Sequence, residues 1–284
     1  MMCSKGWTWY GAVAVGVFGL AVISVPPALA ECTGEDGGAS VVTEIRDGEI
    51  LILGDGRTVR LAGILAPRRT QGGSPSEARA EMEKELAALV QGKKVELRLG
   101  EEKRDRYGRL AAQVMAGSDG GRVWVQERLA GAGLVRIMSY ADNRICIREL
   151  LARENEARAA NLGLWKSGHF AVRAANAESL LNGLVRSYEI VEGRVQKVVE
   201  IRGRTYLNFG EDYRRDFSVY ISEKSARQFG DPGGAGGNAG TEFAKLKGQF
   251  IRVRGWIENF NGPSIAVTHP EQIEVLGSTA ALPR

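Results

Sequence analysis

The chain has 284 residues, of which 44% are hydrophobic and 25% are charged, a composition ordinary for globular protein. We therefore expect packed cores, and the length suggests about two domains of roughly 100–200 residues each. The net charge is +4, because 38 basic residues are nearly balanced by 34 acidic ones. Such a balance permits a nucleic-acid partner, but the net charge alone does not indicate one.

Residues 1–30 have the pattern of an export signal. Lys5 supplies a positive charge, residues 9–25 are apolar, and the small residues that follow suit cleavage after Ala30. We expect a cleaved signal peptide and a periplasmic or secreted location. The alternative is an uncleaved N-terminal membrane anchor, although the apolar run is short for a full span. No other stretch of the sequence is apolar enough to cross a membrane.

Three cysteines are present, and Cys3 would leave with the signal peptide. Cys32 and Cys146 then form an even pair in an oxidising compartment, which predicts a Cys32–Cys146 disulfide. Two free thiols are the alternative. A zinc site is not expected, because neither cysteine is spaced with histidines.

The segment after the signal begins with glycine-rich sequence and continues with strands. Residues 31–40 (ECTGEDGGAS) are predicted to be a flexible lead-in. Residues 41–62 alternate like three strands, with tight turns at Asp47-Gly48 and Asp55-Gly56. Closely spaced strands joined by such turns predict a meander.

Helix-like and strand-like patterns then alternate up to residue 166. Pro75, preceded by a potential cap at Ser74, begins a helix that should run to about Val90. Its buried face should include Met82, Leu86 and Leu89. Two strands (95–99 and 110–116) and two helices (123–135 and 145–165) follow. Five strands with an interposed helix predict a small Greek-key barrel of the OB type.

The second half of the chain repeats the strand-rich pattern over residues 188–278, where we expect a second OB-like barrel. Residues 167–187 are predicted to be a connector with some helix, residues 231–240 a glycine-rich loop, and residues 279–284 a tail. The predicted fold class is mainly β with α (α+β). It consists of two five-stranded OB-type barrels, the first with about three helices.

Five segments within residues 40–166 resemble, in order, those of the staphylococcal nuclease (thermonuclease) family. They are DGEILIL, TVRLAGILAPR, DRYGRLAAQV, VWVQERLAGAGLV and RENEARAANLGLW. Five ordered segments are far more specific than a single motif. The resemblance implies a nuclease-like OB domain over residues 41–166 and calcium-assisted hydrolysis of DNA and RNA phosphodiesters. In that chemistry, the metal and two arginines hold the phosphate while a glutamate activates water.

The resemblance carries several of the family's site residues onto this sequence. The two phosphate arginines fall on Arg60 and Arg109, and a tyrosine close to the phosphate falls on Tyr107. The first metal aspartate falls on Glu49, which still offers a carboxylate to a hard cation. Asp47 matches the other acidic residue of the same turn.

Two positions depart from the family pattern. The second metal aspartate falls on Leu65, which cannot bind a metal, and the general-base glutamate falls on Arg68, which cannot accept a proton at neutral pH. Losing a general base removes a factor of about 10²–10⁴ in rate. Arg68 and its neighbour Arg69 instead add positive charge where a phosphate would lie. The resemblance therefore implies weakened calcium binding and a site better suited to binding phosphate than to hydrolysing it.

Several of these residues also have a purely structural interpretation. Asp47 precedes a glycine and can serve only as a turn residue. Arg60 can act as an ion-pair partner of Glu49, and Arg109 as a partner of Asp105. For these residues, the sequence leaves both the functional and the structural interpretation open.

Tyr107 and Glu77 leave a similar choice. Tyr107 would be assigned to a core if the family pattern were absent. Glu77 could replace the missing base, but its place three residues after Ser74 also fits a capping box.

The second barrel contains the segments YLNFGEDYRRDFSVYI and VRGWIENFNGPSIAVTHPEQIEVL. On these segments it resembles, less specifically, an OB-like C-terminal domain that follows nuclease-like domains in some exported bacterial proteins. OB barrels bind single strands by stacking bases on aromatic side chains within a basic groove. The alternative is that alternate aromatic residues in strands form the core. The residues of suitable type are Tyr206, Phe209, Tyr213, Phe217, Tyr220, Arg214, Arg215, Arg254 and Trp256.

We therefore expect an exported nuclease-like protein that binds nucleic-acid backbone or another anionic ligand, with calcium-dependent hydrolysis weak or lost. One alternative is an active calcium-dependent nuclease in which Asp47, Glu49 or Glu77 stands in for the missing carboxylates. The other is a non-enzymatic module of the cell envelope that binds protein. A membrane span is not expected after cleavage of the signal.

Overall fold

The computed structural model describes residues 32–68, 75–117, 121–229 and 239–277. Cys32–Arg284 form one compact unit, distinct from residues 1–31. The predicted signal peptide, the tail and most of the predicted glycine-rich loop lie outside the described residues. Within the described ranges, no helix is long and apolar enough to cross a membrane.

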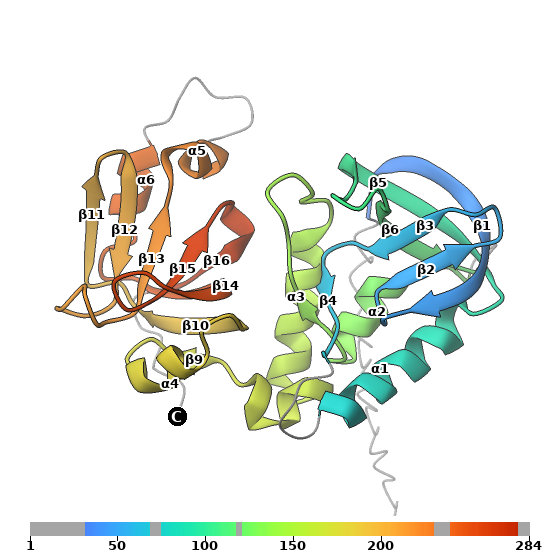
Figure 1. The fold of residues 1–284 in the computed structure, drawn as a ribbon, viewed down its shortest axis with the longest axis horizontal. Helices are drawn as coiled ribbons and strands as arrows, with labels where there is room; N and C mark the ends of the chain where they lie inside the picture. Colours follow the sequence, from blue (N-terminus) through green and yellow to red (C-terminus); the bar gives the residue numbers. More distant parts are fainter. Residues whose placement is uncertain (1–31, 69–74, 118–120, 230–238, 278–284) are drawn as a thin grey trace, which may run out of the picture. The chain divides into compact units, whose positions relative to one another are not determined.

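The first sheet forms a closed five-stranded barrel, as the sequence predicts (Figure 1). Its strands follow the order β3-β2-β1-β5-β6, and a parallel pairing of β3 with β6 closes the ring. The short strand β7 extends the edge beside β6. The strand bounds are β1 Glu35–Arg46, β2 Ile50–Leu53, β3 Thr58–Leu61, β5 Lys94–Arg104, β6 Leu110–Ala116 and β7 Val123–Trp124.

Strand β1 begins at Glu35, so the flexible lead-in predicted over residues 31–40 is wrong from this residue on. The segment pairs with β5, and its register shifts between Asp36 and Ala39. Gly37 allows close packing, because a Cβ atom there would lie 2.9 Å from the Cβ of Leu97. Gly38 has a φ of 76°, which glycine adopts readily. The glycines thus allow an irregular strand where composition suggested a loop.

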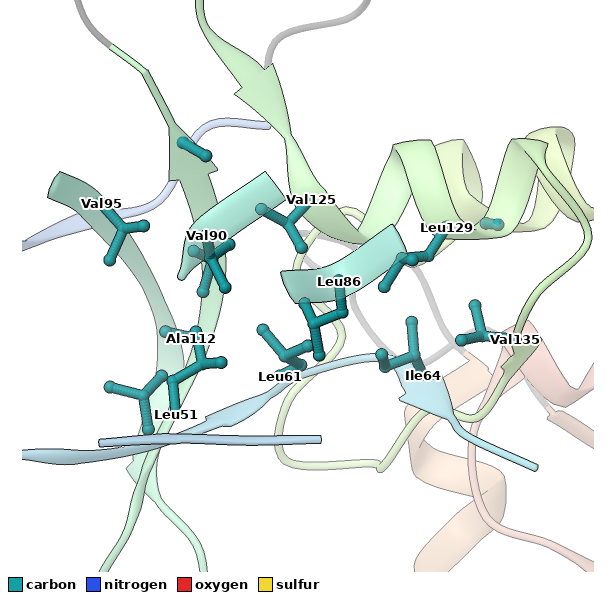
Figure 2. Close-up of a cluster of buried hydrophobic side chains, with 14 of the residues drawn as sticks. Leu51, Leu61, Ile64, Leu86, Val90, Val95, Ala112, Val125, Leu129 and Val135 are labelled. Atoms are coloured by element: carbon teal, nitrogen blue, oxygen red, sulfur yellow. The ribbon is translucent and has the colours of Figure 1, made fainter. Parts of the chain in front are cut away.

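Three helices accompany the first barrel, as predicted. They are α1 Pro75–Val90, α2 Val125–Gly131 and α3 Ile147–Ala159, and a separate two-stranded sheet pairs β4 Ile64–Leu65 with β8 Arg136–Ile137. Helix α1 buries Met82, Leu86 and Val90 completely, whereas Leu89 is only partly buried. Figure 2 shows Leu86 near Leu61 of the barrel and Leu129 of α2. Amphipathic packing of this kind fixes the helix against the barrel.

The second sheet has the same strand order as the first barrel. A path runs β11-β12-β13-β15-β14-β10, with β13 and β15 parallel. Strands β11 and β10 stand at the two ends of this path, and only Val195 and Gln196 separate them in the chain. The sheet therefore curls so that its two ends belong to one stretch of chain. This curled sheet has the order of an OB barrel. Strand β9 joins its edge beside β10, and β16 pairs with β14.

The remaining elements belong to this second half. The strands are β9 Arg173–Ala174, β10 Tyr188–Arg194, β11 Lys197–Ile201, β12 Arg204–Asn208, β13 Ser218–Ile221, β14 Phe250–Asn259, β15 Pro263–Val267 and β16 Ile273–Gly277. The helices are α4 Glu178–Gly183, α5 Glu223–Ala226 and α6 Ala239–Ala244, with short 3₁₀ turns η1 Gly163–Lys166, η2 Gly168–Phe170, η3 Arg227–Phe229 and η4 Pro270–Gln272. The connector predicted over residues 167–187 thus contains helix α4 and also a strand.

A disulfide joins Cys32 to Cys146, as predicted, with 5.5 Å between their Cα atoms. Cys32 lies shortly before β1, and Cys146 is the residue that precedes α3. The bond therefore ties the start of the first strand to the start of the third helix. A disulfide is consistent with an extracellular or periplasmic location.

Arg254 of β14 is completely buried, so its proposed place in a nucleic-acid groove is wrong. Its guanidinium pairs with Glu154 of α3 at 2.7 Å and with Glu274 of β16 at 2.5 Å. Burial alone would lower the pKa of Arg254, but these carboxylates more than offset it, and the pKa is raised. Phe209 and Phe217 are also buried and belong to the core of the second sheet, which confirms the structural alternative for both.

His269 forms a second buried polar contact. Its side chain is 1% exposed, and its Nε2 and Nδ1 atoms lie 2.6 Å from Ser139 Oγ and 2.8 Å from Thr268 Oγ1. Burial, together with the charge of Arg144, lowers the pKa of His269 to about 4 despite the opposing charge of Glu271. The imidazole is therefore neutral at neutral pH, and protonating it requires an acidic solution.

This histidine should make folding sensitive to mild acid. In the unfolded chain this histidine binds a proton near pH 6.5, whereas in the folded protein it does so only near pH 4. The free energy of unfolding therefore decreases as the pH falls through this window. Between pH 7 and pH 5 we expect the free energy of unfolding to fall by about 2 kcal/mol from this group. Urea unfolding at both pH values measures the effect.

The chain supplies a matched control in its other histidine, His169, which is exposed. His269→Gln should remove most of the decrease between pH 7 and pH 5, whereas His169→Gln should leave it unchanged. An equal decrease in both variants would show that other groups cause it. The acidic groups with lowered pKa values act at lower pH, since that of Glu274 is about 2.

Candidate functional site

A cleft of about 600 Å³ brings together most of the residues singled out in the sequence. We call it the main cleft. Arg60, Arg68, Arg109, Tyr107 and Glu49 all line it, although they come from separate segments. The other lining residues are Ala62, Gly63, Leu65, Glu102, Arg104, Asp105, Arg106, Ala111, Met138, Tyr140, Asp142, Asn143 and Trp256.

Glu49 and Arg60 lie side by side because they belong to neighbouring strands. Glu49 immediately precedes β2, and Arg60 of β3 is paired with Ile50. The Nε atom of Arg60 lies 3.8 Å from Glu49 Oε2, and the Ala66 backbone N–H donates to Oε1 at 2.6 Å. Both expectations for Arg60 are thus compatible, since it lines the main cleft and also pairs with Glu49.

Burial governs the protonation of Glu49. It raises the pKa of the carboxyl group, even though the Ala66 N–H and the positive charges of Arg60, Arg68 and Arg79 act in the opposite direction. Burial therefore favours the neutral form of this carboxyl group more than it would for an exposed glutamate. The group can accept hydrogen bonds from cations, and it is the nearest carboxylate to Arg60.

The turn from Asp105 to Arg109 presents a second arginine to the main cleft. Asp105 Oδ1 accepts from the backbone N–H groups of Tyr107 and Arg109, and its other oxygen pairs with the Arg109 guanidinium at 2.6 Å. Burial opposes the negative charge, but these bonds lower the pKa of Asp105. The pairing expected for Arg109 is present, and the carboxylate keeps the guanidinium at the cleft.

Tyr107 is 66% exposed, so the alternative that places it in a core is wrong. Two arginines contact its ring, with the guanidinium carbons of Arg106 and Arg109 each 4.9 Å from the ring centroid. Such cation–π contacts hold the ring at the rim of the cleft, where a ligand can reach it.

Arg68 and Leu65 occupy the positions where the family pattern has carboxylates. Arg68 is exposed, and its guanidinium carbon lies 5.1 Å from the ring centroid of Trp256. Leu65 is buried and packs against Met138 and Tyr188. A cation and an apolar side chain therefore line this part of the cleft. Arg69 lies outside the described residues.

Asp47 lies in a neighbouring pocket of about 550 Å³ rather than in the main cleft. The two cavities share Glu49 and Arg68 as lining residues. The backbone of Asp47 has a φ of 48°, and its side chain is exposed. Its turn conformation supports the structural interpretation, and its carboxylate can still face an ion that occupies the neighbouring pocket.

The donor atoms at this site do not fit calcium well. Calcium takes six to eight oxygen ligands, whereas Glu49 already accepts from Ala66 and faces Arg60. The side chain of Leu65 offers no oxygen. Across the residues that the structure describes, no three His, Cys, Asp or Glu side chains are grouped as a metal site.

Two aromatic residues of the main cleft were not assigned to it from the sequence. Tyr140 is 45% exposed, and the Arg60 guanidinium lies 5.3 Å from its ring centroid. Trp256 was expected in a separate groove of the second barrel, but it lines the main cleft. Tyr140 follows no recognisable motif, so only its exposed position identifies it.

Glu77, considered as a replacement base, is not part of the main cleft. It lines another cavity, of about 300 Å³, together with Glu81 and His169. The proposed cap at Ser74 lies outside the described residues, although α1 begins at Pro75 as the capping pattern predicts.

Residues 58–167 match the family whose description is "Staphylococcal nuclease homologue". The matched region contains Arg60, Arg68, Tyr107 and Arg109, whereas Asp47 and Glu49 precede it. A comparison with curated proteins found no match.

Proposed function

Because residues 58–167 form a domain of the staphylococcal nuclease homologue family, we propose that the chain binds the phosphodiester backbone of nucleic acid in the main cleft. Proteins of this family bind nucleic acid and hydrolyse it. We propose further that calcium-dependent hydrolysis is weak or lost in this chain, that calcium binds weakly, and that the protein acts outside the cytoplasm.

The convergence of Arg60, Arg68 and Arg109 on one cleft carries the proposal. Arginine suits phosphate, because its planar group donates two parallel hydrogen bonds. Arg104 and Arg106 add two more guanidinium groups to the lining, against the four carboxylates of Glu49, Glu102, Asp105 and Asp142. The excess positive charge favours an anionic ligand.

The carboxylates of the site favour phosphate binding over hydrolysis. Arg68 stands where the family pattern has the base, and Asp105 is held by Arg109. Loss of a positioned base costs about 10²–10⁴ in rate. Among the matching positions, only Glu49 offers calcium a carboxylate in the main cleft, and that side chain faces Arg60. The carboxylate of Asp47 lies in the neighbouring pocket.

Glu49 also favours a second candidate function, an active nuclease. A carboxyl group with a raised pKa inside a cleft is a candidate general base. In that case, hydrolysis would proceed with Glu49 in the role of the missing glutamate. A nuclease gel with added calcium separates the two functions. Digestion that disappears in both Arg60→Ala and Arg109→Ala would show that hydrolysis is retained.

Removing Arg60 should weaken nucleic-acid binding by roughly 10- to 100-fold, the range expected for a hydrogen bond to a charged group. The slope of log affinity against log salt should also become shallower by about one unit. Fluorescence anisotropy of a labelled oligonucleotide at several salt concentrations measures both quantities.

Arg128→Ala is the matched control, because Arg128 is exposed, pairs with Glu85 and lies outside the main cleft. Equal affinities for Arg60→Ala and Arg128→Ala would place the binding site elsewhere. If the unchanged protein binds no nucleic acid even at low salt, the third interpretation, an envelope module that binds protein, is favoured. N-terminal sequencing that does not begin at Glu31 would contradict export by cleavage after Ala30.

A further inference from the structure

We propose that Trp256 of the second sheet stacks against an unpaired base, so that the main cleft takes a single-stranded nucleic acid rather than a duplex. The proposal rests on the proposed function and names the ligand class of the same site. It assigns part of this site to a residue well outside the region of residues 58–167 that matches the family.

Trp256 is held in place and yet remains accessible. It lies on β14 opposite Tyr188 of β10, and the two rings meet edge to face with centroids 5.8 Å apart. Tyr188 is buried, and its hydroxyl donates to the Ile137 carbonyl at 2.9 Å. Trp256 itself is 38% exposed and lines the main cleft. A large ring that is fixed on one side and open on the other can receive a stacked base with little loss of conformational freedom.

Arg68 covers the ring of Trp256, and its positive charge also acts on the carboxyl group of Glu49. Its guanidinium carbon lies 5.1 Å from the ring centroid, and it forms no ion pair with any carboxylate among the described residues. Arg68 can therefore move from the ring to a phosphate without breaking a salt bridge. A base can then take the place of the guanidinium, since both planar groups stack on an aromatic face.

Each of three aromatic rings around the main cleft has an arginine over it, and Tyr107 has a second one in Arg106. Arg60 lies over Tyr140 at 5.3 Å, Arg109 over Tyr107 at 4.9 Å and Arg68 over Trp256 at 5.1 Å. All six residues line the cavity. Each pair offers a flat face for a base and a cation for a phosphate.

This alternation indicates the single-stranded class. Bases of a duplex are stacked on one another and present only their edges in the grooves, so they cannot stack on cleft walls. Bases of a single strand are free to do so, and every base has a face that can stack. The arrangement therefore favours unpaired strands and makes little distinction between base sequences.

The test compares three ligands on the full chain by fluorescence anisotropy. They are a short oligothymidylate, an abasic strand of the same length, and the duplex of the oligothymidylate with its complement. Trp256→Ala should weaken binding of the oligothymidylate about 10-fold or more, whereas binding of the abasic strand should be nearly unchanged. Trp256→Phe, which keeps a ring, should recover most of the affinity.

Phe260→Ala is the matched control. Phe260 is an aromatic residue that directly follows β14, is 42% exposed and does not line the main cleft. Its removal should leave the affinity for all three ligands unchanged. Thermal unfolding of each variant shows whether the loss of a ring contact with Tyr188 has disturbed the fold.

Tryptophan fluorescence gives a readout that a purely structural role of Trp256 would not change. Stacking of a base should quench the emission of the unchanged protein, and this ligand-dependent change should disappear in Trp256→Phe although the strand still binds. Trp124 and Trp165 are present in both proteins and cannot account for the difference.

The outcomes separate the two proposals. Equal affinity of Trp256→Ala and the unchanged protein for the oligothymidylate, or binding of the duplex as tight as that of the single strand, overturns this inference and leaves the proposed function intact. Failure of the unchanged protein to bind any of the three ligands overturns the proposed function and the inference with it.

Discussion

Replacing Arg254 with methionine is expected to lower the free energy of unfolding by about 3–5 kcal/mol. Methionine occupies a similar volume but leaves Glu154, whose side chain is fully buried, without its counter-ion. A buried charge that loses its partner retains its full desolvation penalty. Glu274 loses a partner as well, although Arg252 still contacts it at 3.1 Å.

Urea unfolding at neutral pH measures this effect, and two further variants test its cause. Arg254→Met combined with Glu154→Gln should recover part of the loss, because glutamine removes the charge and can still accept the Ile137 N–H. Arg227→Met removes an ion pair with Glu223 in which both side chains are more than 70% exposed, so stability should change by less than about 1 kcal/mol. Similar losses for the buried and the exposed arginine would contradict our account.

Restoring two carboxylates should restore hydrolysis. In the double variant Leu65→Asp, Arg68→Glu, we expect calcium-dependent cleavage at least about 100-fold above that of the unchanged protein, because a general base alone contributes roughly 10²–10⁴. The aspartate would add an oxygen ligand near Glu49, and the glutamate would replace a cation with a proton acceptor. A nuclease assay with and without a chelator measures the gain.

The matched control is Leu65→Asn, Arg68→Gln, which has nearly the same shape and no added carboxylates. Leu65 is buried against Met138 and Tyr188, so both double variants should lose stability, and thermal unfolding must show that each is folded at the assay temperature. A folded carboxylate variant with no gain in cleavage would mean that the cleft differs from an active site at more than these two positions.

The fold of the first barrel could be predicted because its signals are local. Alternating strands, turns at aspartate–glycine pairs and an amphipathic helix all depend on neighbouring residues. The start of β1 was missed, because Gly37 and Gly38 have the composition of a loop. The contacts that make them part of a strand come from β5, about 60 residues away in the sequence.

The candidate site was predicted in part, and Arg254 and Trp256 show where sequence reasoning ends. They lie two residues apart on β14, and the alternation of a strand places them on the same face. Arg254 is buried because Glu154 of α3 lies opposite it, whereas Trp256 faces an open cleft. What covers each position depends on segments distant in sequence, and no local pattern reveals it.

The disulfide between Cys32 and Cys146 has a consequence for the covalent topology of the site. It closes a ring with a sequence separation of 114. The ring encloses all strands of the first barrel and, with them, Glu49, Arg60 and Arg109. If a protease cuts the chain once inside the ring, the two pieces remain one molecule until the bond is reduced. Arg60 and Arg109 would then still belong to one covalently linked molecule in a nicked protein.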